Sequence, residues 1–125
     1  MDQRTLETKL ADLYLGGIRY FGSVTSTNDL ALRWAGAGAP DLALVAANEQ
    51  TAGRGRQDHI WFTPPDSALA FSLVLRPQSS KEYSNTQLYT ALGALAVCET
   101  LNETFPAVFP AQIKWPNDIV ANRRK

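Results

Sequence analysis

Apolar residues in the N-terminal part of the chain recur at spacings that predict an alternation of helix and strand. Residues 5–15 carry leucines at helical spacing, and Gly16-Gly17 then supplies a stop where left-handed backbone angles are allowed. Residues 18–24 alternate between two faces, as expected of a half-buried strand. The segment Ser26-Thr27-Asn28-Asp29 places a carboxylate three residues after a hydroxyl, which predicts the start of a helix that runs to about Ala35.

The remaining hydrophobic pattern continues this alternation. Residues 42–48 form a continuous apolar run of strand length, which is typical of a central strand covered on both faces. Residues 68–75 predict a second strand with its larger side chains on one face, and residues 84–102 predict a helix that opens with a capping box. Residues 113–115 and 119–120 predict short strands around a proline turn. These elements predict an α+β fold, a mixed α/β sandwich.

The composition describes one domain and excludes several chemistries. The 125 residues are 45% apolar, which is enough for a packed core, and carry 12 basic against 12 acidic side chains. This zero net charge argues against a general nucleic-acid binder. One Cys and one His cannot build a four-ligand zinc site or an internal disulfide, and Cys98 on an apolar helical stretch is interpreted as a buried thiol.

The apolar runs are also too short for a membrane protein. The longest, residues 42–47, is far below the roughly 18 residues that a membrane-spanning helix needs. The N-terminal residues lack the apolar region of a signal peptide. We therefore expect a cytoplasmic protein with no membrane partner.

The most unusual segment is rich in glycine and follows the predicted central strand. Its sequence is Gly53-Arg54-Gly55-Arg56-Gln57-Asp58-His59-Ile60-Trp61. Glycines let backbone N–H groups approach an anion closely, and arginines add fork-shaped donors suited to phosphate or carboxylate. The segment therefore predicts an anion cradle, with a glycine hairpin and solvated arginines as the alternative. Asp58 stands where the dinucleotide fingerprint needs its third glycine, and no Walker loop is present.

Two further segments carry candidate chemistry. In Lys114-Trp115-Pro116-Asn117-Asp118, a cation for phosphate stands beside a carboxylate able to hold Mg²⁺, although an Asx-type turn with Trp115 as core filler explains the same residues. Ser26-Thr27-Asn28 predicts a helix cap whose N–H groups also favour a bound polar or anionic group. Gln50 could offer an amide to a ligand or to a sheet edge, and His59 is interpreted as an exposed or structural loop residue.

Taken together and in this order, the three segments resemble the catalytic region of biotin protein ligases. The matching residues are Ser26-Thr27-Asn28, Glu49-Gln50-Thr51-Ala52-Gly53-Arg54-Gly55-Arg56 with Trp61, and Lys114-Trp115-Pro116-Asn117-Asp118. The resemblance runs from about Ile18 to Lys125 and implies the fold of class II aminoacyl-tRNA synthetases and biotin synthetases. Residues 1–125 would then be a partial catalytic domain, with its C-terminal part, the SH3-like domain and any DNA-binding domain absent.

The resemblance also implies a two-step, ATP-dependent reaction. Biotin and ATP form biotinyl-5'-adenylate and pyrophosphate, and a lysine of a biotin carboxyl carrier protein then takes the acyl group. That carrier belongs to acetyl-CoA carboxylase or to another biotin-dependent carboxylase. Held cations and Mg²⁺ suit this chemistry because two anions must be joined. The implied partners are the carrier protein, biotin and ATP, with a second copy of the chain in a homodimer.

By the same resemblance, individual residues acquire roles. Arg54 and Lys125 would be catalytic. The biotin-binding residues would be Ser26, Thr27, Asn28, Gln50, Gly53, Arg54, Gly55, Arg56 and Lys125. The residues that bind ATP or the adenylate would be Arg56, Trp61, Lys114, Asn117 and Asp118, with Asp118 as the metal ligand. The segment from Gly53 to Trp61 would fold over the adenylate and exclude water.

Two departures from the family pattern matter. Asp58 and His59 stand where the family usually has a second glycine and a third arginine, so a negative charge and a mostly neutral ring face the phosphate. We predict that Asp58→Gly with His59→Arg tightens binding of a biotinyl-adenylate analogue, and a titration with equal or weaker affinity would contradict this. The chain is also shorter than family catalytic regions, and an unpaired strand edge is expected to cause association or a poorly cooperative melt.

Two alternative functions stay open on the sequence alone. A truncated or degenerate paralogue would bind biotin without turnover, and both Asp58 and His59 favour it. A lipoate ligase or octanoyltransferase would share the fold but lacks the Gly-Arg-Gly-Arg run and the Lys-Trp-Pro-Asn-Asp block. A biotin-dependent pyrophosphate release assay separates an enzyme from a binder, because a binder gives saturation without turnover.

Overall fold

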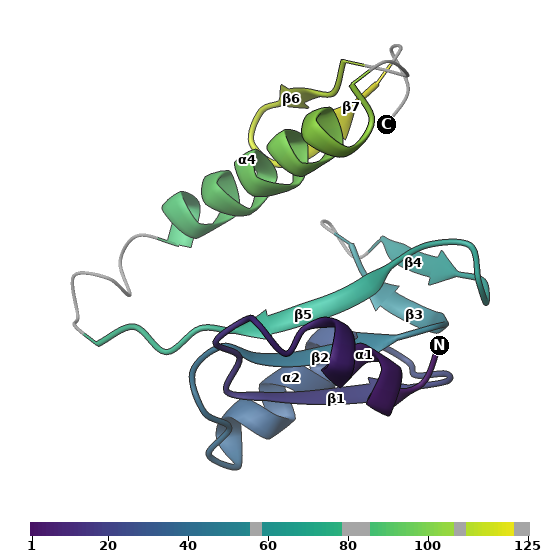
Figure 1. Cartoon of the computed structure of the whole chain (residues 1–125), viewed down its shortest axis with the longest axis vertical. Helices are drawn as coiled ribbons and strands as arrows, with labels where there is room; N and C mark the ends of the chain where they lie inside the picture. The colour runs from purple at the N-terminus through teal and green to yellow at the C-terminus, as the bar shows by residue number, and fades with distance from the viewer. Residues whose placement is uncertain (56–58, 79–85, 107–109, 122–125) are drawn as a thin grey trace. The chain divides into compact units, whose positions relative to one another are not determined.

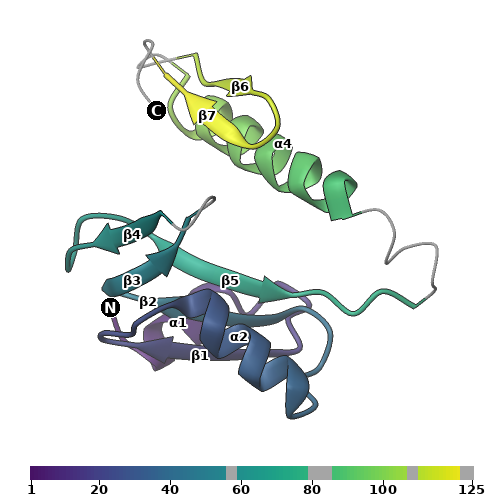
Figure 2. The same cartoon turned by 180° about the vertical axis from the view of Figure 1, so that it is seen from behind.

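The computed structural model describes residues 1–55, 59–78, 86–106 and 110–121. It divides into two compact units, unit 1 over Met1–Arg76 and unit 2 over Pro77–Lys125 (Figures 1 and 2). Unit 1 contains the glycine-rich segment and the Ser26 block, which is Ser26-Thr27-Asn28. Unit 2 contains the Lys114 block, which is Lys114-Trp115-Pro116-Asn117-Asp118. Each unit is a mixture of helix and strand, which confirms the predicted mixed α/β composition.

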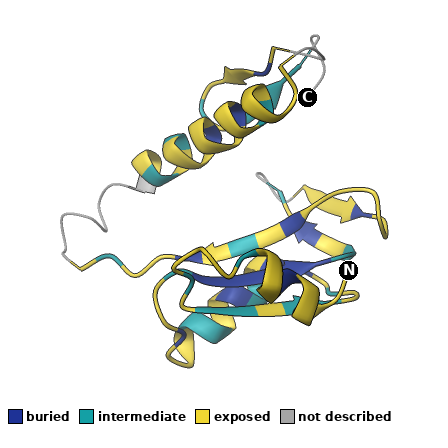
Figure 3. Ribbon diagram, in the orientation of Figure 1, coloured by how far each residue is buried: buried dark blue, intermediate teal, exposed yellow. Residues whose placement is uncertain are grey.

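A three-stranded sheet forms the centre of unit 1. Its strands are β1 (Gly17–Phe21), β2 (Ala43–Ala47) and β5 (Ala70–Val74), in the order β1-β2-β5. Strand β2 runs parallel to β1 and antiparallel to β5. All five residues of β2 are buried, as the dark blue central strand in Figure 3 shows. This confirms the prediction that the continuous apolar run forms a central strand.

Helix α2 (Thr27–Gly36) packs on one face of this sheet, and α1 (Gln3–Lys9) lies on the opposite face in both views (Figures 1 and 2). The core between α2 and the sheet consists of small residues, which lets the helix approach closely. Its members are Ala31, Ala39, Ala43, Val45 and Val74, with Phe21, Leu30, Trp34 and Ala35 packed around them. The start and length of α2 agree with the sequence prediction.

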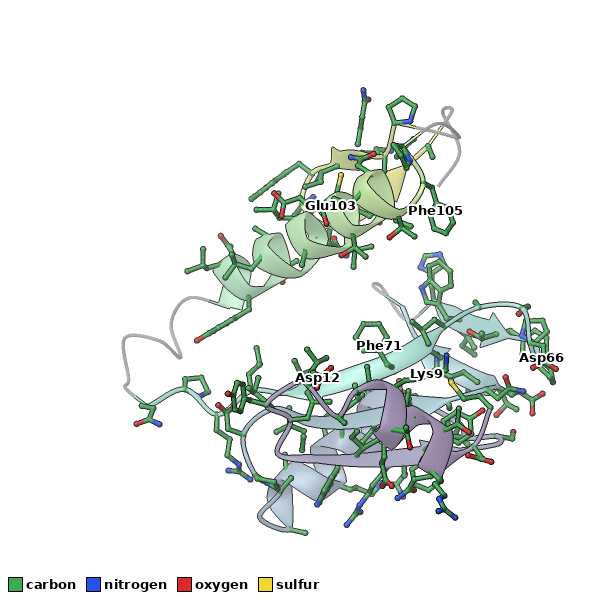
Figure 4. All side chains as sticks on the ribbon, viewed as in Figure 1. Lys9, Asp12, Asp66, Phe71, Glu103 and Phe105 are labelled. Atoms are coloured by element: carbon green, nitrogen blue, oxygen red, sulfur yellow. The ribbon has the colours of Figure 1, made fainter. Side chains whose placement is uncertain are left out.

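Strand β5 buries its small side chains rather than its large ones. Ala70 and Val74 are buried and pair with Ala47 and Ala43 of β2, on the side that α2 covers. The Phe71 side chain, labelled in Figure 4, is 50% exposed. The strand was predicted correctly, and its small-residue face is the one that meets the helix.

Helix α1 is shorter than predicted. It begins at Gln3 after the cap Asp2 and ends at Lys9, instead of continuing to residue 15. Tyr14 is 96% exposed, so the predicted last turn makes no apolar contact that would stabilise a longer helix. At the start of α1, hydrogen bonds from Thr5 to the carboxylate hold the pKa of Asp2 below its ordinary value. The following strand is also shorter than predicted and ends at Phe21.

Unit 2 consists of one long helix and one hairpin. Helix α4 spans Thr86–Thr104, and β6 (Gln112–Lys114) pairs with β7 (Asp118–Val120) in antiparallel register. The Asn102 side chain bonds both backbone groups of Ala111, and the buried Cys98 Sγ donates to the same carbonyl. The buried thiol and the hairpin were both predicted. Ser84, which opens the predicted capping box, lies outside the described residues.

No helix within the described ranges, including the 19-residue α4, has the apolar length that a membrane crossing requires.

Candidate functional site

The candidate site in unit 1 forms where the segment before α2 runs beside the start of β3 (Gln50–Arg54). Val24 N donates to Glu49 O at 3.1 Å, and Thr51 N donates back to Val24 O at 3.0 Å. Ala52 N donates to the carbonyl of the next residue, Thr25, at 2.9 Å. These backbone bonds bring two segments that are distant in the sequence into register, so the N-terminus of α2 lies beside Gln50.

Three polar side chains from three elements meet at this point. Gln50 Oε1 accepts from the backbone N–H of Thr27 at 2.8 Å and from its hydroxyl at 3.0 Å. The Thr27 hydroxyl also lies 3.0 Å from Ser72 Oγ on β5. Thr27 is 3% exposed, whereas Gln50 and Ser72 are half-buried. The structure therefore brings together two sequence-predicted residues, Thr27 and Gln50, and adds Ser72.

The other residues of the Ser26 block occupy the first turn of α2. Ser26 is fully buried, and its Oγ accepts from Asp29 N at 3.3 Å, as expected of a helix cap. Asn28 follows on the same turn and is exposed. The capping interpretation of this block is confirmed, and the helix start also directs backbone N–H groups toward the Gln50 side.

The described ends of the glycine-rich segment, on either side of residues 56–58, pair as the two strands of a hairpin. Strand β3 pairs with β4 (Ile60–Thr63), and Gly55 N donates to His59 O at 2.7 Å to close the turn. A Cβ on Gly55 would lie 2.7 Å from that carbonyl and 2.9 Å from the Trp61 ring. A Cβ on Gly53 would lie 2.7 Å from Gln50 Nε2 and 2.8 Å from Trp61 O. Both glycines are therefore required by close approach.

The hairpin places one cation at the helix start. Arg54 Nε donates to Asp29 Oδ1 at 2.6 Å, and the arginine side chain stays 67% exposed. The guanidinium thus lies beside the first turn of α2, with most of its donors directed to solvent. Trp61 and His59 are both exposed, which agrees with the interpretation of His59 as a loop residue. Arg56 and Asp58 lie outside the described residues.

The Lys114 block forms the β6–β7 hairpin of unit 2. Lys114 pairs directly with Asp118 across the two strands, so their side chains share one face. Lys114 and Asn117 are exposed, and Asp118 is half-buried. Trp115 is 73% exposed, which contradicts the alternative that it fills a core. Lys125 lies outside the described residues.

The residues around Asp118 suit Mg²⁺ only with help from phosphate. Within the described part of the chain, no group of three or more His, Cys, Asp or Glu side chains is placed to hold a metal ion. Mg²⁺, however, is often held by one or two carboxylates together with substrate phosphates and water. A single half-buried carboxylate beside a lysine fits that pattern, because the lysine can attract the same phosphates.

Sequence reasoning missed two residues of the unit 1 site. Asp29 was assigned only to the helix cap, yet its carboxylate binds Arg54. No local signal in the sequence pairs Asp29 with Arg54, because the two residues lie 25 positions apart. Ser72 was hidden among the small residues of β5, and only the strand pairing shows that it faces α2.

Known proteins with similar sequences and structures are ligases. A biotin–(acetyl-CoA-carboxylase) ligase of Paracoccus denitrificans is 40% identical over 100 residues, which are 80% of this chain and 40% of that protein. The bifunctional ligase/repressor BirA of Bacillus subtilis is 38% identical over 106 residues, which are 85% of this chain and 31% of the relative. The structure of the Aquifex aeolicus biotin protein ligase in complex with biotin and ATP matches 82% of this chain and 40% of its own, with 34% identity and a TM-score of 0.67.

The chain spans less than half of each of these three proteins. The region that matches the family model contains both the unit 1 site and the β6–β7 hairpin of unit 2. Residues 20–125 match the biotin/lipoate A/B protein ligase family, and the chain belongs to this family.

Proposed function

We propose that this chain binds biotin and ATP and forms biotinyl-5'-adenylate, as part of a biotin protein ligase catalytic domain. The observation that carries the proposal is the buried contact between Thr27 and Gln50 beside the glycine hairpin and Arg54. The Aquifex aeolicus relative was solved with biotin and ATP, which supports this choice of ligands. The finer fold assignment, that of class II aminoacyl-tRNA synthetases and biotin synthetases, belongs to the same proposal.

The uncharged ring of biotin suits the buried part of the site. Its ureido group carries both N–H donors and a carbonyl acceptor, so it needs polar partners of both kinds in a water-poor pocket. Thr27 and Gln50 supply them in this proposal, with Ser26 and Asn28 from the same turn of α2. Gly53 and Gly55 let the backbone come close to the ring, because neither position has room for a side chain.

The charged part of the reaction requires cations. A biotin carboxylate oxygen bonds to the α-phosphorus of ATP, and the bond from that phosphorus to the pyrophosphate oxygen breaks. Arg54 and Arg56 would bring the two anions together and reduce their repulsion, with Lys125 as a further cation. Trp61, Lys114 and Asn117 would contact the nucleotide. Asp118 would hold Mg²⁺ together with ATP phosphates, and the bound ion supplies charge neutralisation for the leaving pyrophosphate.

The second step transfers the acyl group to a protein. The amine of a carrier lysine bonds to the biotinyl carbonyl carbon, AMP leaves, and the amine loses a proton. The Paracoccus denitrificans relative is named for acetyl-CoA carboxylase, so we propose the biotin carboxyl carrier protein of that enzyme as the acceptor. Dimerisation and a cytoplasmic location, where ATP is supplied, are parts of the same proposal.

The test measures binding and turnover separately. We expect the chain to bind biotin in a calorimetric titration and to release pyrophosphate from ATP and Mg²⁺ only when biotin is present. Arg54→Ala should lower the rate about 10- to 100-fold, because a cation at the reacting phosphate is lost. The exposed Arg33 on α2 supplies the matched control, since Arg33→Ala removes the same charge elsewhere and should leave the rate unchanged.

Other outcomes would favour other functions. Saturable biotin binding without pyrophosphate release would assign the chain to the degenerate binders. Turnover with lipoate or octanoate in preference to biotin would refute the assignment to biotin. Equal rates for Arg54→Ala and Arg33→Ala would remove Arg54 from the reaction.

A further inference from the structure

The hydrogen bonds among Thr27, Gln50 and Ser72 have a direction that the atoms themselves determine. A backbone N–H can only donate, so the Gln50 atom 2.8 Å from Thr27 N must be the amide oxygen. This contact fixes which way the Gln50 amide is turned. The amide nitrogen, Nε2, must then lie on the other side of the Gln50 side chain.

The proton of each hydroxyl follows from the same reasoning. The Gln50 oxygen only accepts, so the Thr27 hydroxyl 3.0 Å away donates its single proton there. The Thr27 oxygen therefore has no proton left for Ser72, and Ser72 Oγ must donate across their 3.0 Å contact. The hydrogen bonds therefore all donate in one direction, from Ser72 to Thr27 and from Thr27 to Gln50. Bonds linked in this way polarise and strengthen one another.

This direction leaves the donor side of Gln50 facing the hairpin. The amide oxygen is occupied by two bonds from Thr27, and Nε2 lies 2.7 Å from the position that a Cβ on Gly53 would take. Gln50 Nε2 therefore packs against the Gly53 backbone, where no room is left for a further atom. Any group that bonds to this nitrogen must accept a hydrogen bond, because an amide nitrogen only donates.

We infer that Ser72 is a positioning residue, which acts through the Thr27 hydroxyl to fix the orientation of the Gln50 amide. This inference rests on the proposed biotin-binding function, in which Gln50 is one of the residues that contact biotin. Ser72 does not need to touch biotin. Its hydroxyl proton satisfies an acceptor lone pair of the Thr27 oxygen, while the Thr27 proton stays on Gln50.

The experiment measures biotin affinity in a double-mutant cycle. Ser72→Ala should weaken biotin binding about five- to tenfold, because one partly buried hydrogen bond supports the orientation of Gln50. In a Thr27→Val background the same substitution should have no further effect, since the hydroxyl through which Ser72 acts is absent. Thr27→Ser keeps the hydroxyl and the backbone N–H, so it should bind biotin more tightly than Thr27→Val does. Ser67→Ala removes an exposed loop hydroxyl and is the matched control.

A second substitution tests the polarity of Gln50. Gln50→Glu keeps an oxygen for Thr27 but loses the N–H donors, so it should weaken biotin binding more than Ser72→Ala does. Affinity for ATP alone should be the same in every variant, which a general loss of structure would not allow. Thermal melts of all variants check that the fold is retained. If Ser72→Ala does not fold, Ser72→Cys, which replaces the hydroxyl with a weaker donor, is measured in its place.

Three outcomes would overturn the inference. Biotin affinity of Ser72→Ala equal to that of Ser67→Ala would show that Ser72 does not position the site. An equal loss from Ser72→Ala in the parent and in Thr27→Val would show that it does not act through the Thr27 hydroxyl. A parent chain that binds no biotin would refute the proposed function itself, whereas a binding parent with unaffected variants would refute only the role of Ser72.

Discussion

Gly53 gives the sharpest test of the hairpin geometry, because a single methyl group should disturb two contacts at once. In Gly53→Ala the new Cβ would lie 2.7 Å from Gln50 Nε2 and 2.8 Å from Trp61 O. An ordinary contact begins at 3.4 Å, so Gln50 Nε2 would have to move by roughly 0.7 Å and Trp61 O by roughly 0.6 Å. Trp61 O belongs to the paired β4 backbone, and Thr27 holds the Gln50 amide by two hydrogen bonds. Neither neighbour can move without weakening another bond.

The expected destabilisation follows from this overpacking. Forcing an extra carbon into a filled site usually costs about 1 to 3 kcal/mol. In a domain of about 100 residues, each kcal/mol lowers the melting temperature by roughly 4 to 8 °C. We therefore expect the melting temperature of Gly53→Ala, followed by circular dichroism, to be at least roughly 4 °C below that of the parent. Biotin affinity should fall as well, because the displaced atom belongs to Gln50, a proposed biotin contact.

Gly36 supplies the matched control for this substitution. It is the last residue of α2, and a Cβ there would meet no atom within 4 Å. Gly36→Ala should be neutral or stabilising by up to about 1 kcal/mol, because alanine loses less backbone entropy in a helix. The reasoning would be refuted if Gly53→Ala melted at or above the parent temperature. It would also be refuted if both variants were destabilised by the same amount, since the effect would then not depend on space.

Three further predictions concern single interactions elsewhere. Asp29→Asn should lower the free energy of unfolding by less than about 1 kcal/mol at low salt, because the ion pair to Arg54 is partly exposed. Denaturation at high salt should remove this difference, and a difference that persists there would contradict the prediction. The lowered pKa of Asp2 means that its contribution to α1 is present above the ordinary carboxyl pKa and is lost as pH falls through the lowered value; an NMR titration with an unshifted midpoint would contradict this. Asn102→Ala should remove two hydrogen bonds to the segment before β6 and cost about 1 to 2 kcal/mol, seen as faster amide exchange there, whereas unchanged exchange would mean that those bonds do not order the segment.

The sequence predicted those elements whose pattern is local. The apolar run of β2 and the cap at Ser26 each depend on residues within a few positions of one another, and both were found as predicted. The β3–β4 hairpin was not chosen over an open cradle, because glycine and arginine do not produce the alternation by which strands are recognised. Helix α1 was overestimated, since leucine spacing does not reveal whether a partner surface exists.

The contacts that build the site are the part that one sequence could not supply. Ser72 lies 45 positions from Thr27, and Arg54 lies 25 positions from Asp29. Such pairs depend on strand order and register, which follow from how the whole unit packs. The residue types were available in the sequence, but their partners were not.

The two halves of the unit 1 site differ in exposure, and this difference predicts which half affects biotin affinity and which affects the reaction rate. Thr27 is 3% exposed and is held by bonds that need no ligand, so the buried half is already arranged for an uncharged, hydrogen-bonding group. Arg54 is 67% exposed and makes one weak ion pair, so it can turn toward an anion at little energetic cost. Substitutions in the buried half should therefore change biotin affinity and stability together. Substitutions of Arg54 should change the rate of adenylate formation while the melting temperature falls no more than in Asp29→Asn, because both lose the same ion pair and the Arg54 charge matters most when two anions are brought together.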